Sequence, residues 1–185
     1  MKVEPITEVK HIKAIKKALK DHPRDRLLFV MGINSGMRVQ DLLRLRIKDI
    51  HHKGIGDRVL LKEKKTGKEN VLIINREIHD AISVFLQSEE SGENEFLFKS
   101  RKGDNYPLSV FRVMHMVKAW TESIKLKGNY GAHTLRKTWC YMQRKEFGAS
   151  WEVIAKRLNH SSPSITRRYL GVKEEEVEEV LLNNI

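Results

Sequence analysis

The segment from Arg26 to Ile33 constrains the fold most, because nearly every face of the helix that it predicts is apolar. It contains the run Leu27-Leu28-Phe29-Val30-Met31. A helix at a protein surface keeps a polar face, so a helix that is apolar all round must be enclosed by other elements. The chain has 185 residues, of which 40% are hydrophobic, and this is enough to enclose one such helix. We therefore expect residues 1–185 to form a single domain built around it.

Helical spacing of apolar residues predicts helices on both sides of this segment. Thr7 is expected to cap a first helix within residues 1–25, and Pro23 suits the first turn of the buried helix. The run Asn34-Ser35-Gly36 is expected to end the buried helix, with a third helix starting near Met37. Five more helices are expected, at about residues 78–86, 109–117, 134–147, 150–158 and 162–169. Serines expected to cap the later helices are Ser109, Ser150 and Ser162, and Gly148 is expected to end one of them.

The clear β pattern lies between residues 59 and 74. Val59-Leu60-Leu61 and Val71-Leu72-Ile73-Ile74 flank a polar turn, Lys64-Lys65-Thr66-Gly67-Lys68. Two apolar runs around such a turn predict an antiparallel hairpin. The expected fold class is therefore mainly α with a small antiparallel β-hairpin, an α+β domain.

The charge distribution favours an anionic partner. Net charge is +11, and the residues from Lys173 onward contribute −4 of it, so that residues 1–172 carry +15. A basic body suits a DNA backbone, although a lysine-rich solvated surface would explain the charge equally well. The single cysteine, Cys140, excludes an internal disulfide. The absence of a signal peptide or of roughly 18 consecutive apolar residues makes a cytoplasmic protein the default expectation.

Five short segments carry chemistry, and each has an ordinary explanation when it is taken alone. Arg38 follows a helix break, where helix N–H groups favour an anion, but a surface arginine is the more common explanation there. His133 and Arg136, three residues apart, share a helix face and can grip one phosphate. Lys65 is at the hairpin tip, His160 follows a predicted helix end, and Tyr169 by itself would be a core or rim residue.

Taken in chain order, these segments resemble the tyrosine recombinase (phage integrase) family. The resemblance covers about Leu27 to Gly171 and is most specific in Leu158–Pro163 and Thr166–Tyr169. This stretch is similar to the family's box that joins the last active-site histidine to the nucleophile. The family often has glycine where this chain has Asn159, but asparagine also tolerates left-handed backbone.

The resemblance implies that Tyr169 attacks the scissile phosphate, leaving a 3′-phosphotyrosyl bond and a free 5′-hydroxyl. Arg38 and Arg136 would hold the non-bridging oxygens, because a guanidinium donates two hydrogen bonds and stays protonated. The transition state concentrates charge on those oxygens.

The same resemblance assigns the remaining roles. Lys65 would protonate the departing 5′-oxygen, with Lys64 or Lys68 as fallbacks. His133 would assist proton transfer at the tyrosine, and His160 would hydrogen-bond the phosphate.

Neither metal nor nucleotide cofactor is expected, because attack by tyrosine conserves the phosphodiester bond energy. The sequence holds no phosphate-binding Gly-x-x-x-x-Gly-Lys-Ser/Thr loop, no paired Cys-x-x-Cys and no His-Glu-x-x-His, and its histidines are scattered apart from His51-His52. The expected partners are double-stranded DNA and further copies of the chain, as a tetramer on paired sites.

Two parts of the domain organisation stay open. The N-terminal helical domain of many relatives is absent, which fits either an excised catalytic domain or a natural short form. The acidic tail, residues 172–185, predicts a helix with an apolar stripe that either exchanges between protomers or folds back on its own domain.

Two other function classes compete with recombination. Trp151–Leu158 and Pro163–Leu170 resemble a helix-turn-helix that would direct Arg167 and Arg168 toward DNA in a non-catalytic regulator. A type IB topoisomerase would share the same site residues but is usually longer.

Overall fold

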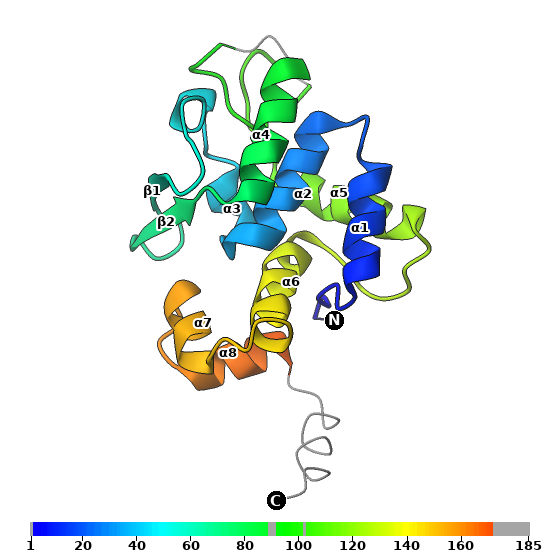
Figure 1. Ribbon diagram of the computed structural model, residues 1–185, viewed down its shortest axis with the longest axis vertical. Helices are drawn as coiled ribbons and strands as arrows, with labels where there is room; N and C mark the ends of the chain where they lie inside the picture. Colours follow the sequence, from blue (N-terminus) through cyan, green and yellow to red (C-terminus); the bar gives the residue numbers. More distant parts are fainter. Residues whose placement is uncertain (1, 89–91, 102, 172–185) are drawn as a thin grey trace, which may run out of the picture.

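The computed structural model describes residues 2–88, 92–101 and 103–171 (Figure 1). It confirms the expected fold class, since most elements of the described residues are helices and their one sheet has two antiparallel strands. The helices are α1 (Val9–Ala18), α2 (Pro23–Ser35), α3 (Val39–Leu42), the 3-10 turn η1 (Ile47–Asp49), α4 (Arg76–Ser88), α5 (Val110–Ser123), α6 (Ala132–Lys145), α7 (Trp151–Arg157) and α8 (Pro163–Leu170), and the strands are β1 (Arg58–Lys62) and β2 (Glu69–Ile73).

Helix α2 is enclosed, as its sequence predicts. Its residues Leu27–Met31 are each at most 1% exposed, and Gly32 is also buried. Helices α4, α6 and α1 pack around it (Figure 1). The helices α2 and α6 approach closely at Gly32, where an added Cβ would lie 2.6 Å from Leu135 Cδ1. A side chain at Gly32 would therefore push α6 away from the core.

The break after α2 places Arg38 between two helices. Gly36 adopts a left-handed φ of 65°, and a Cβ there would lie 2.8 Å from the Trp139 ring. The chain then turns with a hydrogen bond from Met37 N to Ser35 Oγ, 3.2 Å long. The third helix, expected near Met37, is a single short turn that begins at Val39, with Arg38 in extended backbone as its N-cap.

The hairpin has the predicted antiparallel pairing, with Leu60 opposite Val71. Its turn is closed by two backbone hydrogen bonds, from Glu63 N to Lys68 O and from Gly67 N to Glu63 O, each 2.9 Å long. Gly67 has a φ of 66°, a conformation that favours glycine. These bonds fix the loop that carries the predicted lysine.

The helices α7 and α8 form a small C-terminal unit against α6, at the lower end of the molecule in Figure 1. They enclose a second, smaller core of Cys140, Ile154, Leu158 and Leu170. The predicted serine caps are confirmed, because the hydroxyls of Ser109, Ser150 and Ser162 accept hydrogen bonds from Arg112 N, Val153 N and Ile165 N.

Two expectations about helix starts were wrong. Helix α1 is preceded by Glu8 rather than capped by Thr7, and no side chain caps it. The chain before α1 is instead held from a distance, since Ile6 N donates to Thr138 Oγ1 over 2.8 Å. Helix α6 begins at Ala132, ahead of Thr134, because the Thr134 hydroxyl accepts a hydrogen bond from Gly131 N.

The predicted C-terminal helix, residues 172–185, lies outside the described residues. Among the residues that are described, no helix is long and apolar enough to cross a membrane.

Candidate active site

The six predicted site residues come from separate parts of the fold. They are Arg38 before α3, Lys65 in the hairpin turn, His133 and Arg136 in α6, His160 between α7 and α8, and Tyr169 in the last turn of α8. Arg38, Lys65 and His133 line one pocket of about 220 Å³. The remaining three adjoin it, as the following contacts show.

Arg38 is held by a carboxylate that the sequence analysis did not single out. Its side chain is 14% exposed, and its Nη1 lies 2.6 Å from Glu63 Oε2. This contact is an ion pair, and Nη1 makes no hydrogen bond within the described part of the chain. The guanidinium is therefore fixed by charge while it keeps donor capacity for another anion.

Arg136 is buried, with 2% of its surface exposed. Its Nη2 donates to the carbonyl of Leu158, 2.6 Å away, whereas Nη1 is buried and has no hydrogen-bond partner among the described residues. Burial, together with the charge of Arg38, lowers the pKa of Arg136 to about 10, so it remains a cation at neutral pH. One arm of this arginine secures the C-terminal unit, and the other is free for a ligand.

Tyr169 brings its hydroxyl into the same region. The hydroxyl is buried and has no hydrogen-bond partner in the described ranges. Burial raises the pKa of Tyr169 to about 12, although the charges of Arg136 and Arg38 act in the opposite direction. The tyrosine is therefore neutral in the free protein, and its reaction as a nucleophile requires loss of a proton to a base.

The two histidines of the site both have a lowered pKa. Desolvation and the charge of Arg136 lower the pKa of His133, which lies near the surface. Burial and the same arginine lower the pKa of His160 to about 4. His160 contacts the Tyr169 ring edge to face, with ring centroids 5.5 Å apart, and its Nδ1 is 2.9 Å from Thr166 Oγ1. Both imidazoles are therefore neutral near pH 7 and are able to accept or share a proton.

The backbone before His160 supports its position. Asn159 has a φ of 54°, the left-handed conformation that the sequence analysis expected asparagine to tolerate. His160 N then donates to Ala155 O over 3.0 Å, which closes the end of α7. This turn directs the chain back toward α8 and Tyr169.

Sequence reasoning missed the buried polar residues that surround the arginines. Glu63 and Asn70 are each at most 8% exposed. Glu63 stands in the run Lys62-Glu63-Lys64-Lys65, where one acid among lysines suggests a surface charge. The strand alternation, which buries every second residue, was the only signal that could have indicated its burial.

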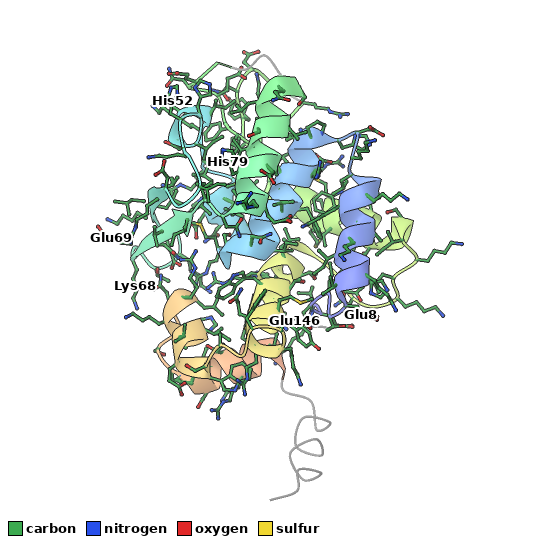
Figure 2. All side chains as sticks on the ribbon, viewed as in Figure 1. Glu8, His52, Lys68, Glu69, His79 and Glu146 are labelled. Carbon is green, nitrogen blue, oxygen red and sulfur yellow. The ribbon has the colours of Figure 1, made fainter. Side chains whose placement is uncertain are left out.

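One possible metal-ligand group lies apart from this site. His51, His52 and Glu93 place their ligand atoms within 4.8 Å of one another, and all three are exposed. His52 lies at the end of the molecule opposite α7 and α8 (Figure 2). The group therefore takes no part in the cluster around Tyr169.

The model of the Phage integrase family matches residues 6–176. The "Probable integrase/recombinase YoeC" of Bacillus subtilis is 36% identical over 176 residues, which cover 94% of this chain and 92% of that protein. The tyrosine recombinase XerC of Pelobacter propionicus is 32% identical, but its match covers 85% of this chain and only 50% of the relative.

Solved structures agree on the fold. The crystal structure of XerA recombinase superposes with a TM-score of 0.78 at 18% identity, over 98% of this chain and 67% of that one. The XerH site-specific recombinase, in a post-cleavage complex with its difH substrate, gives a TM-score of 0.77 at 20% identity, over 98% and 53%. The extent of the family match and the identity to these relatives lead to one conclusion: this chain belongs to the phage integrase family of tyrosine recombinases.

Proposed function

We propose that the protein is a site-specific DNA recombinase that cleaves and rejoins DNA through a covalent bond between Tyr169 and a 3′-phosphate. One observation carries this proposal. The Tyr169 hydroxyl and Arg136 Nη1 are both buried without a hydrogen-bond partner among the described residues, in the same cluster as Arg38. Buried donors without partners are costly, so a site that keeps them is suited to a ligand that satisfies them.

A DNA phosphodiester fits these donors. The Tyr169 oxygen forms a bond to phosphorus while the bond from phosphorus to the 5′-oxygen breaks. Arg38 and Arg136 neutralise the non-bridging oxygens, which carry the most charge in the pentacoordinate transition state. One phosphodiester is exchanged for another, so the bond energy is kept. The 5′-hydroxyl of an incoming strand can then attack the phosphorus, form a new phosphodiester and release Tyr169.

Two protons move during this exchange. His133, whose neutral imidazole faces the pocket that Arg38 and Lys65 also line, assists removal of the tyrosine proton. Lys65, which is exposed on the hairpin turn, donates a proton to the departing 5′-oxygen. His160 contributes a hydrogen bond to the phosphate. General acid and base groups of this kind typically accelerate such steps by about 10²–10⁴-fold.

The proposed partner is duplex DNA, bound in the cytoplasm in association with the nucleoid. Copies of the chain assemble on it as a tetramer on paired sites. The net charge of +15 on residues 1–172 supports backbone binding. Such binding should weaken with salt by a log–log slope of roughly 0.9 per phosphate neutralised.

The helix-turn-helix regulator is less well supported. In that function α8 would present Arg167 and Arg168 to DNA, but Arg136 and the Tyr169 hydroxyl would have no reason to be buried together. A regulator that does not cleave DNA also has no need for a lysine such as Lys65 in the same pocket as Arg38.

Covalent capture tests the proposal. The protein is incubated, in a metal chelator, with a library of nicked duplexes of randomised sequence, so that a cleaved fragment diffuses away and traps the adduct. DNA that stays bound to denatured protein is sequenced and resynthesised as the test duplex. We expect a denaturant-resistant adduct that Tyr169→Phe abolishes and that depends on sequence. An adduct that forms on every duplex and relaxes any supercoiled plasmid would indicate a topoisomerase, and shifted mobility without adduct would indicate a regulator.

A further inference from the structure

A buried carboxylate, Glu63, lies at the end of β1 beside the proposed cationic site. The residue is 1% exposed, and its side chain is fully buried. Oε2 lies 2.6 Å from Arg38 Nη1 and accepts a hydrogen bond from the Thr66 hydroxyl over 2.5 Å. Oε1 accepts from Asn70 Nδ2 over 2.7 Å. Both oxygens are therefore engaged, which is what a buried carboxylate requires to offset its desolvation.

The contacts of Glu63 extend to the C-terminal unit. Asn70 Oδ1 accepts a hydrogen bond from Arg157 Nη1, on the last turn of α7. Arg157 Nε also donates to the carbonyl of Ser35, 2.9 Å away, at the end of α2. Glu63, Asn70 and Arg157 thus form a continuous polar link between the hairpin, the break that carries Arg38, and the helix pair that carries the tyrosine.

The hairpin turn depends on the same residue through its backbone. Glu63 N and O make both hydrogen bonds that close the turn, and its carboxylate holds the Thr66 hydroxyl next to Lys65. A second carboxylate, Asp41 at the start of α3, accepts a hydrogen bond from Lys64 N over 2.9 Å. The lysine turn is therefore tied to the two elements on either side of it.

We propose that Glu63 is a positioning residue, which fixes Arg38 and the lysine turn in position relative to each other and to the C-terminal unit. This inference rests on the proposed function. Glu63 acts through two contacts that can be tested separately. The ion pair orients the phosphate-binding arginine, and the Thr66 contact orients the turn of the proton donor. Rigid placement of this kind is what electrostatic stabilisation of a transition state demands.

Glu63 does not itself carry a proton in this proposal. Burial alone would raise its pKa, but hydrogen bonds from Thr66, Asn159 and Asn70 and the charge of Arg38 outweigh that effect and lower the pKa of Glu63 to about 2. It is therefore ionised at every pH of a practical assay. A substitution at Glu63 should change the cleavage rate but should not add a further ionisation to its pH dependence.

The first test compares two variants with wild type on the duplex recovered by covalent capture. Glu63→Gln keeps the shape but removes the charge that holds Arg38. We expect single-turnover adduct formation to slow by about 10- to 100-fold, in line with loss of one aligned donor, with the duplex Kd changed by less than about threefold. Glu69→Gln removes an exposed acid from the same hairpin, at its outer edge in Figure 2, and should leave the rate within about twofold.

A double-mutant cycle distinguishes positioning from a general structural effect. If Glu63 acts through Arg38, then Glu63→Gln should slow an Arg38→Ala protein by less than about threefold further. Independent, multiplying defects would overturn the proposal, as would a wild-type rate for Glu63→Gln.

The contact between Glu63 and Thr66 is tested by a separate variant, which also tests the proposal if Glu63→Gln does not fold. Thr66→Val removes one hydroxyl from an exposed turn and leaves the ion pair with Arg38 in place. We expect slower cleavage of the ordinary duplex and recovery on a duplex with sulfur in place of the bridging 5′-oxygen, because a thiolate leaves without a proton. A wild-type rate on the ordinary duplex would overturn the proposal. If wild-type protein itself forms no Tyr169 adduct, the proposed function is what fails.

Discussion

Replacing Tyr169 by phenylalanine should make the protein more stable while it abolishes cleavage. The tyrosine hydroxyl is buried and has no hydrogen-bond partner among the described residues. Desolvating such a group without a partner costs about 1–3 kcal/mol, and Tyr169→Phe removes that cost while it keeps the ring and its contact with His160. We expect a gain of at least about 1 kcal/mol in the free energy of unfolding, or about 2–4 °C in Tm for a chain of this size.

The pH dependence sharpens this prediction. The pKa of Tyr169 is about 12 in the folded protein, and about 10 is usual in an unfolded chain. A group whose folded pKa is raised contributes stability that is complete below pH 10 and is lost as pH rises from 10 to 12. Wild type loses this contribution, and the phenylalanine variant does not. The gap between them should therefore widen by about 0.8 kcal/mol at pH 10.5, toward a limit of about 2.7 kcal/mol.

Urea unfolding of both proteins without DNA, at several values from pH 7 to 10.5, measures this difference. Tyr106→Phe is the control, since Tyr106 is 68% exposed and its variant should match wild type at every pH. A Tyr169→Phe protein that is less stable than wild type at pH 7, or whose advantage shrinks above pH 10, would refute the reasoning. Either result would mean that the hydroxyl has a partner in solution.

Three further outcomes are expected. Lys65→Ala should lose cleavage of an ordinary duplex and regain it on the sulfur-substituted duplex, whereas Lys64→Ala and Lys68→Ala should cleave both duplexes. A larger defect for Lys64→Ala or Lys68→Ala would identify that lysine as the proton donor instead. Between pH 6.5 and 4, urea titrations should show a smaller fall in the free energy of unfolding for His160→Gln than for wild type. The reason is that the folded protein holds this imidazole at a pKa of about 4 and resists its protonation. Asn159→Gly and Asn159→Ala both remove the hydrogen bond to Glu63, but φ is 54° there, so the alanine variant should be about 1 kcal/mol less stable than the glycine variant in thermal melts; equal Tm values would show that the turn is not strained.

The sequence was most informative where local chemistry decides the structure. The caps at Ser109, Ser150 and Ser162 and the end of α2 at Gly36 follow from short-range preferences, and all four were predicted. The enclosed helix α2 was predicted because its composition leaves no polar face.

The sequence was least informative where partners are distant along the chain. Glu63 meets Arg38 25 positions away, and Arg157 meets Ser35 across 122 positions, so neither contact has a local signature. The start of α1 was misplaced for the same reason. The segment before it is held by Thr138, 132 residues from Ile6, rather than by a cap.

The small core under α7 and α8 has a consequence for heat inactivation. Among the described residues, its buried members are Cys140, Ile154, Leu158 and Leu170, whereas Met37 and Val39, on either side of Arg38, belong to the much larger body around α2. A core of that size resists opening less than the body does. On warming, Tyr169, the proposed nucleophile, should separate from Arg38 before the rest of the domain melts, so that the proposed strand cleavage fails at a temperature where circular dichroism still reports a folded protein.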